Sequence, residues 1–382
     1  MIAGWYLMLR IPFCGMECLG KDSENMRNIL LLLFSAMLSC IGSTMHANDG
    51  VYYAKGNQLV PIRETDISVA KEVLTISLGD DGFARVDVAY EFMNHGASKV
   101  VDMGFEATNP YNTGDSINPK GVHPYIEDFT VEMNGEKLFV KNSLVEPGLL
   151  DTPYKGRPQD VPEEFERYSY AYIFKAQFHE GLNRVHHTYR YRMSFGVGRT
   201  FEVPYWLTPA TRWKGGNIGD FTLRIRADHT AKHFLLPDSV FSFTNFRVTE
   251  GKGKIRRSKF GWSCDMIEIA LRNGTVEWHA TNFIPQTDMC IQSADTYISF
   301  DTNYPVGTFY DRSDHYAIWP LERNVSKQVA RNLPYANRGY VFKKKSLKRL
   351  FDSFWWYMPD PKWQPSTDDF TPREWRLIKE GR

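Results

Sequence analysis

The sequence predicts a mainly β protein: an antiparallel β-sandwich region of two stacked units, followed by a small α-rich C-terminal domain. From about residue 48 to residue 300, apolar and polar residues alternate over short runs, which is typical of half-buried strands. Gly, Asn and Asp clusters separate the runs and no helical pattern intervenes, as in antiparallel sandwiches. After that the apolar spacing becomes helical. We therefore expect a β-sandwich region over residues 48–304 and an α-rich domain over residues 305–382.

The β region divides into short runs that we predict to be strands. They cover residues 74–78, 86–92, 100–106, 129–133, 138–140, 170–178, 184–195, 221–227, 241–249, 266–272, 276–280 and 295–300. Asn134-Gly135 and Asn273-Gly274 each separate two runs, and the Asn-Gly pair favours two-residue hairpin turns. Residues 147–166 are rich in Pro, Gly and charge, which predicts the division between the two stacked units there.

The C-terminal domain is predicted to hold three helices. Residues 325–333 and 343–354 have helical spacing, and the second segment opposes an apolar stripe to a row of basic residues. Three prolines then favour an extended passage. Thr371-Pro372 supplies an N-cap and a proline at the first helical position, which predicts a last helix ending near Gly381.

The N-terminus predicts export. Met26 begins a short cationic start and an apolar run that is too short for a span of about 20 residues. We interpret residues 26–47 as a signal peptide, and residues 1–25, which carry several acids, as a mis-annotated start. Cleavage after Ala47 competes with lipidation at Cys40 and with an uncleaved anchor. All three routes place the protein outside the cytoplasm, in the periplasm or at the cell surface, with membrane contact only through the signal or a lipid anchor.

Cysteine usage agrees with export. After ordinary cleavage only Cys264 and Cys290 remain, and an even pair in an oxidising compartment can form a disulfide. Two buried thiols are the alternative. No CxxC or clustered histidine accompanies them, so a zinc site is not expected.

Several function classes lack their sequence signals. The formal net charge is +1, so no global field favours nucleic acid, and we expect no nucleic-acid partner. Phosphate loops, dinucleotide fingerprints, HExxH and GxSxG are absent, so we predict no cofactor, no metal and no catalytic residue. His186 and His187 are adjacent, but neighbouring residues of a strand point to opposite faces, which argues against a shared metal.

A motif near the C-terminus carries a family resemblance. The segment Tyr335-Ala336-Asn337-Arg338-Gly339-Tyr340 is followed by Trp355-Trp356-Tyr357, and over roughly residues 321–380 this resembles the YARHG domain. That resemblance implies a secreted bacterial protein and no established activity. The Arg-His of the family is Asn337-Arg338 here, so we assign no acid–base chemistry to the motif. The β region, notably residues 51–142 and 205–221, resembles the uncharacterised β-rich domain that precedes YARHG, which implies an extracytoplasmic sandwich.

The C-terminal domain also supplies the candidate binding residues. From Arg331 to Arg382 there are twelve Lys and Arg against six Asp and Glu. Exposed aromatic rings stack on sugars and cations hold carboxylates, so these residues could bind a wall polymer; a packed aromatic core with a solvated basic rim is the alternative. The candidates are Tyr335, Asn337, Arg338, Gly339, Tyr340, Lys344, Lys345, Trp355, Trp356, Tyr357 and Trp363.

These observations favour a non-enzymatic envelope protein. Its C-terminal module would bind a cell-wall glycan or another envelope component, and the β region would be a scaffold or interaction surface. The alternative is a secreted or periplasmic hydrolase of glycans or peptides, which a pair of carboxylates in a cleft would favour.

Overall fold

The structure is a computed structural model of the chain. It describes residues 56–57, 60–61, 66–108, 121–146, 149–153, 169–195, 201–260, 264–293, 297–300, 306–311 and 317–380. The predicted start at Met26, the signal peptide at 26–47 and the lipidation site at Cys40 lie outside these residues. No helix within the described ranges is long and apolar enough to cross a membrane.

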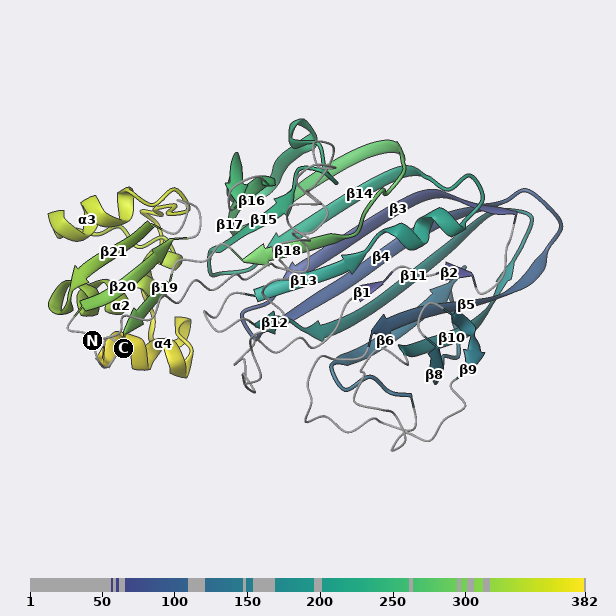
Figure 1. The fold of residues 1–382 in the computed structure, drawn as a ribbon, viewed down its shortest axis with the longest axis horizontal. Coiled ribbons are helices and arrows are strands. Elements are labelled where there is room, and N and C mark those ends of the chain that lie inside the picture. The colour runs from purple at the N-terminus through teal and green to yellow at the C-terminus, as the bar shows by residue number, and fades with distance from the viewer. Residues whose placement is uncertain are drawn as a thin grey trace, which may run out of the picture.

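The described chain is mainly β with a small helical C-terminal region, as predicted (Figure 1). The strands are β1 (Gly56–Asn57), β2 (Val60–Pro61), β3 (Ile67–Leu78), β4 (Phe83–Asn94), β5 (Lys99–Thr108), β6 (Ile126–Met133), β7 (Glu136–Lys137), β8 (Lys141–Glu146), β9 (Leu149–Pro153), β10 (Ser169–Phe178), β11 (Gly181–Arg192), β12 (Ser194–Phe195), β13 (Phe201–Trp206), β14 (Ile218–Ala227), β15 (Lys232–Pro237), β16 (Phe246–Phe260), β17 (Cys264–Phe283), β18 (Met289–Ser293), β19 (Tyr297–Phe300), β20 (Val306–Asp311) and β21 (Ala317–Glu322). The helices are α2 (Arg323–Asn337), α3 (Lys345–Asp352) and α4 (Pro372–Glu380), with short 3-10 turns η3 (Thr208–Arg212), η4 (Phe243–Asn245) and η6 (Thr367–Asp369).

The described strands form one large sheet and two smaller ones. The large sheet runs β1-β13-β18-β15-β17-β14-β3-β4-β11-β6-β7, with β12 beside β13 and β16 beside β17. Most pairs are antiparallel, but β14 lies parallel to β3 and β1 parallel to β13. The sheet is therefore mixed, because the chain between β3 and β14 is long enough to return in the same direction.

The long strand β17 corrects one sequence prediction. Asn273-Gly274 does not turn the chain; it lies within a single strand. The first half of β17 pairs with β15, the second half with β14, and β16 runs along both. The register of β16 shifts opposite this point, where a Cβ at Gly274 would lie 2.7 Å from the Glu250 carbonyl oxygen. The Asn-Gly pair therefore lies at an irregularity in the pairing of β16 with β17, where Asn273 has a positive φ of 47°.

A five-stranded sheet, β2-β5-β10-β8-β9, packs on one end of the large sheet, and the two share one core (Figure 1). Phe105 and Tyr172 from the small sheet meet Phe129 and Tyr189 from the large one. Strands from both sides of residues 147–166 enter the same sheets: β10 pairs with β5, and β11 with β4. The predicted division of the β region at 147–166 is therefore not seen.

The C-terminal module comprises β19–β21 and α2–α4 and lies at the opposite end of the molecule from the small sheet (Figure 1). The three predicted helices correspond to α2, α3 and α4. β19 pairs with β20, so the module includes strand residues on both sides of the expected boundary at residue 304. The expected boundary therefore falls between two paired strands, β19 and β20.

Strand order does not support the predicted disulfide. Cys264 begins β17 and Cys290 lies buried in β18, but β15 runs between these two strands. Strands two positions apart in a sheet are separated by roughly 9–10 Å, whereas a disulfide needs Cα atoms about 4.4–6.8 Å apart. Cys264 and Cys290 therefore do not lie on neighbouring strands.

Candidate functional site

The outer face of β15, β16 and β17 receives the C-terminal module. In β17, Ile267, Ile269 and Leu271 point into the sandwich core, so Glu268 and Arg272 must face outward. All of these residues are buried, because the module covers the outer face as well. Cross-strand partners share a face, and they add His233 from β15 and Lys252, Lys254 and Arg256 from β16. The strands thus present a cationic strip to the module.

Lys254 is the central contact of this interface. Its Nζ donates to the backbone carbonyls of Trp355, at 2.8 Å, and Tyr357, at 3.0 Å. Desolvation, with Arg256 nearby, lowers the pKa of Lys254. Lys252 lies 3.6 Å from the Asp360 carboxylate. The module therefore meets the cationic strip largely with backbone oxygens, which accept hydrogen bonds without adding a buried charge.

Beneath Trp355 lies a buried ionic triad. Glu268 is fully buried and accepts hydrogen bonds from His233 Nε2 at 2.5 Å and Arg256 Nε at 2.6 Å. Burial raises the pKa of Glu268, but the hydrogen bonds from His233 and Arg256 outweigh burial, and the pKa is lowered. The Trp355 ring lies 4.4 Å from the Arg256 guanidinium carbon and 5.7 Å from the His233 ring. Trp355 therefore covers the triad, although the Arg256 side chain remains 34% exposed.

The motif segment, residues 335–340, lies against the same face of the sheet. The Ala231 amide donates to the Asn337 carbonyl at 2.9 Å, and Ala336 packs in a cluster with Ala270 of β17. Gly339 has a φ of 84°. A Cβ there would lie 2.7 Å from the Met358 carbonyl oxygen and 2.9 Å from the Arg272 guanidinium carbon. Glycine is required at this position both by the backbone conformation and by the close approach of the sheet.

Arg338 holds the module together internally. Its guanidinium makes a two-pronged pair with the Glu374 carboxylate, at 2.7 and 3.0 Å, and lies 4.7 Å above the Phe370 ring. Glu374 also accepts from the Thr371 amide, while the Glu374 amide donates to the Thr371 hydroxyl, which confirms the predicted N-cap of α4. A histidine would not supply this fork. The departure from the family motif is therefore matched by a carboxylate partner on α4.

The aromatic candidates divide into four environments. Trp356 and Tyr357 are buried in the module core with Phe351, where no sugar ring could stack. Trp355 covers the triad. Tyr335 and Tyr340 are half-buried and pack edge to face. Trp363 is half-buried and lines a cleft. The structure thus does not bring the candidates together as one exposed platform, because a module of this size uses most of its rings as core.

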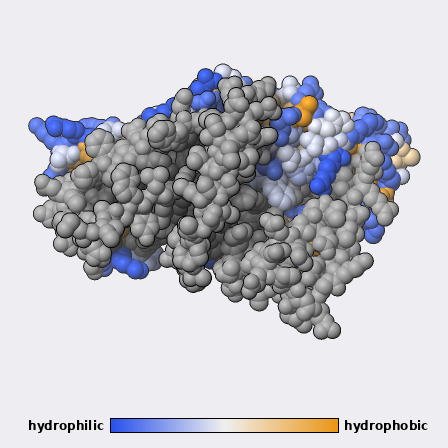
Figure 2. All heavy atoms as spheres, viewed as in Figure 1, coloured by the Kyte–Doolittle hydropathy of each residue, from blue (hydrophilic) through white to orange (hydrophobic). Residues whose placement is uncertain are grey.

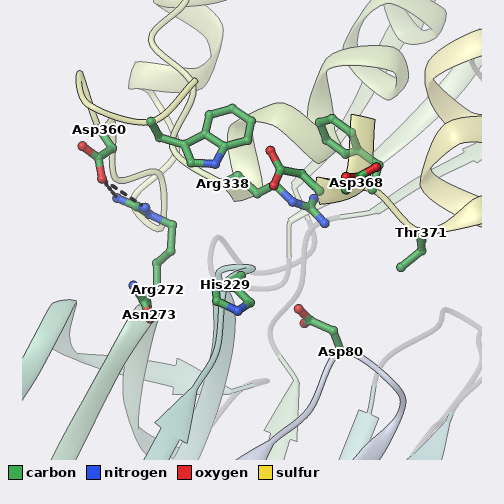
Figure 3. Close-up of a pocket in the computed structure, with 11 residues that line it drawn as sticks. Asp80, His229, Arg272, Asn273, Arg338, Asp360, Asp368 and Thr371 are labelled. Carbon is green, nitrogen blue, oxygen red and sulfur yellow. Dashed lines mark hydrogen bonds and ion pairs between the residues drawn. The ribbon is translucent and has the colours of Figure 1, made fainter. Parts of the chain in front are cut away.

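The cleft at the boundary of module and sheet has a volume of about 510 Å³. We call it the boundary cleft (Figure 3). It is lined by Asp80, His229, Arg272, Asn273, Arg338, Asp360, Trp363, Asp368, Asp369, Phe370 and Thr371. Residues of the module, of two sheet turns and of β17 contribute to it, so it exists only when the module is docked.

Two of its carboxylates are held by cations. Burial raises the pKa of Asp80, but Lys232 and Thr230, which donate to its carboxylate, and the more distant Arg338 bring the pKa below its ordinary value. The Lys362 amide lowers the pKa of Asp360, and Lys252 and Arg272 add to this. Both groups are therefore poorly suited to act as general acids, which need a raised pKa.

A second feature of the module is a row of exposed cations at the start of α3. Lys343, Lys344, Lys345, Lys348 and Arg349 are all exposed. We call them the basic face. Within the described ranges only Lys348 has an ion pair, with Asp352. Figure 2 shows hydrophilic atoms gathered at the end of the molecule where Figure 1 places α3. Lys344 and Lys345 are therefore exposed, unlike the buried Trp356 and Tyr357.

The described histidines are not gathered into one cluster. No group of three or more potential metal ligands occurs among the residues that the structure describes. His186 faces outward, 3.1 Å from the Asp87 carboxylate. His187 is fully buried between the rings of Tyr90 and Tyr189. The opposite orientations follow from strand alternation, as the sequence predicted.

Sequence reasoning missed the interface residues of the sheet. Lys252 and Lys254 lie inside β16. Their spacing of two, continued by Arg256, was the available signal, because alternate residues of a strand share a face. Nothing in the sequence alone indicated which surface would cover that face.

The comparisons with known proteins identify one domain. A YARHG domain, a domain of extracellular proteins, is found at residues 327–381, which confirms the resemblance drawn from the motif. No curated protein matches the chain. Among solved structures, a candidate nutrient-binding protein from Legionella pneumophila covers 88% of this chain and 100% of its own, with 17% identity and a TM-score of 0.48.

Two further solved structures are more distant. An M1 zinc metallopeptidase from Deinococcus radiodurans matches with 8% identity and a TM-score of 0.23, over 63% of this chain and 45% of its own. Baculovirus P35 matches with 12% identity and a TM-score of 0.25, over 62% of this chain and 98% of its own. These scores and identities are low, so what those proteins bind or cleave is not transferred to this chain.

Proposed function

We propose that this is an exported, non-enzymatic envelope protein whose C-terminal module binds an anionic cell-wall polymer through the basic face. The observation that carries the proposal is the row of five exposed cations from Lys343 to Arg349, within which there is no acidic residue. Lysines on exposed stems attract carboxylate or phosphate groups without a shaped pocket, which suits an extended, repeating polymer.

The positions of the other candidates support this choice of surface. The module's buried rings build its core, and Trp355 and Lys254 attach it to the sheet. The β region then serves as the scaffold on which the module is fixed. The basic face remains accessible because α3 directs its apolar residues, Leu347 and Phe351, inward.

The hydrolase alternative is less well supported. Glycoside hydrolysis needs one carboxylic acid that stays protonated near neutral pH, usually because its pKa is raised. In the boundary cleft, Asp80 and Asp360 have lowered pKa values instead. We therefore assign no general-acid role to Asp80 or Asp360.

Cosedimentation of the purified chain with insoluble peptidoglycan tests the proposal. We expect the native chain to pellet at low salt and to be released as ionic strength rises, since screening weakens exposed charge contacts. Lys344→Glu combined with Lys345→Glu should weaken binding at least tenfold, because each basic residue near an anionic surface contributes about 1 kcal/mol.

The matched control reverses the same charge elsewhere. Lys137 and Lys141 are exposed on the sandwich, far along the chain from α3, so Lys137→Glu with Lys141→Glu changes the net charge equally. Retained binding in this control, with loss in the α3 variant, supports the basic face. Failure of the native chain to pellet, or equal loss in both variants, would overturn the proposal.

A further inference from the structure

The boundary cleft has two ends of different charge. Figure 3 shows Arg272 and Asp360 on one side of Arg338, and Asp368 and Thr371 on the other. Arg338 forms an ion pair with Glu374, so its charge is largely neutralised. Its side chain lies between the two ends of the cleft. The two ends can therefore be considered separately.

Arg272 provides an incompletely paired cation at the first end. Its side chain is only 7% exposed, and its Nε has no hydrogen-bond partner among the described residues. Its terminal nitrogens lie 3.4 and 3.5 Å from a single Asp360 oxygen. Charge-assisted hydrogen bonds are usually about 2.7–2.9 Å long, so this pair is loose, and Asp360 also faces Lys252. A buried guanidinium in this state is expected to donate a hydrogen bond to an additional anionic or carbonyl oxygen.

The second end is acidic. Asp368 and Asp369 belong to the short turn η6 and line the cleft. Neither has an ion-pair partner within the described ranges, whereas every other carboxylate lining the cleft has one. Asp369 accepts from the Ser366 amide, which fixes its orientation. An ammonium group is the natural partner for two such carboxylates.

An aromatic wall adjoins these ends. Trp363 is half-buried in the cleft, and its indole N–H donates to no described residue. It packs edge to face against Tyr340 and Phe370, so the ring is held in place. An indole face attracts an organic cation and also covers short apolar groups. The wall therefore suits the body of a small organic ligand.

We propose that the boundary cleft binds a small zwitterion, an amino acid or a short peptide with a free ammonium and a free carboxylate. The ammonium would lie at Asp368 and Asp369, the carboxylate at Arg272, and the body against Trp363. A volume of about 510 Å³ accommodates a ligand of this size. The site is distinct from the basic face, and it does not depend on polymer binding there.

Three probes test the charge requirement on the full chain. L-alanyl-L-alanine carries both charges, its N-acetyl form lacks the ammonium, and its C-terminal amide lacks the carboxylate. Isothermal titration calorimetry should show binding of the zwitterion and at least tenfold weaker binding of each modified form. Absence of zwitterion binding, or equal binding of the modified forms, would overturn the proposal.

Variants then locate the site. Asp368→Asn with Asp369→Asn keeps the oxygen that accepts from Ser366 and removes both charges, so we expect a loss of at least tenfold in affinity for the zwitterion. Asp352→Asn, an exposed acid on α3, is the matched control and should leave affinity unchanged. Unchanged affinity in the cleft variant would place the ligand elsewhere. The Lys344→Glu, Lys345→Glu variant should bind the zwitterion as the native chain does, which separates this proposal from the polymer proposal.

Discussion

The sandwich interior and the module–sheet interface are both buried, but they are held by different forces. The sandwich core is largely apolar, with rings stacked along a strand, as in Tyr90 and Phe92 of β4. The interface is built around charges: the Glu268 triad and Lys254. Apolar burial tolerates small changes in position, whereas a desolvated charge depends on its partner. The interface should therefore be the more sensitive of the two to single polar substitutions.

Removing the anion of the triad should give the largest effect. Glu268→Ala leaves His233 and Arg256 facing each other beneath Trp355 without a carboxylate, and breaking a buried pair costs about 3–5 kcal/mol. We expect the free energy of unfolding to fall by that amount in urea titrations. Glu277→Ala is the control, since Glu277 lies on the same strand and pairs with two arginines at the surface. There the expected loss is below about 1 kcal/mol, and equal losses would contradict the comparison.

The sandwich interior also contains a buried histidine, His187, which makes stability depend on pH. Burial lowers the pKa of His187 to about 3, with a smaller contribution from His186. In the unfolded chain the histidine pKa is near 6.5, so this residue binds a proton below about pH 6.5. In the folded chain His187 stays neutral over the same range, which favours unfolding as the pH falls. Stability from this residue is complete above that pH and is lost as the pH falls toward 3, by about 1.4 kcal/mol per unit.

His187→Phe should remove that pH dependence. Between pH 6 and pH 4 we expect the slope of unfolding free energy against pH to decrease by about 1.4 kcal/mol per unit, measured by urea titration at several pH values. His186→Gln, at the exposed neighbour, keeps the buried imidazole and should retain this part of the slope. An unaltered slope in His187→Phe would show that the unfolding transition does not include the sandwich core.

A glycine pair sharpens the comparison at the backbone level. Gly339 at the interface and Gly181 in the sandwich have nearly the same φ, 84° and 83°. A Cβ at Gly181 would meet nothing within 4 Å, whereas one at Gly339 would meet the Met358 carbonyl and Arg272. Thermal unfolding should show a loss of about 1–2 kcal/mol for Gly181→Ala from conformation alone, and a larger loss for Gly339→Ala. Equal losses would mean that the sheet can move away from the module.

The smallest effect is expected outside both regions. Lys348 forms an exposed pair with Asp352, four residues along α3. Lys348→Ala should lower the unfolding free energy by only about 0.3–0.5 kcal/mol in urea titrations, because solvent screens such pairs. A loss above 1 kcal/mol would show that α3 is held more by its ion pair than by its buried residues.

Local patterns predicted much of the fold. Alternation located most strands, and the stripe of Leu347 and Phe351 located α3. Residues 241–249 were predicted as one strand, but η4 occupies 243–245 and β16 begins at Phe246. Here aromatic residues that resemble a strand in sequence pack as a turn, with Phe241 against Trp278. Local preference gave way to tertiary packing, as it does for many short apolar runs.

The candidate site was predicted only in part. The motif predicted the C-terminal module. That module contains the predicted candidates Arg338, Trp363 and the lysines at α3. The boundary cleft also needs Asp80, His229 and Arg272, which come from turns and strands more than 60 residues away in the chain. No spacing rule connects such residues, because their proximity depends on how the module docks.

The sequence by itself determined the β-rich class, the helices of the module, the N-cap at Thr371 and the presence of a YARHG domain. Each of these depends on neighbouring residues: side-chain alternation, helical spacing, capping and a contiguous motif. Only the tertiary structure decided the mixed sheet, the burial of Trp356 and Tyr357, the Glu268 triad and the boundary cleft. These depend on which surfaces meet, and that choice minimises the exposed apolar area and the unpaired charge of the whole chain.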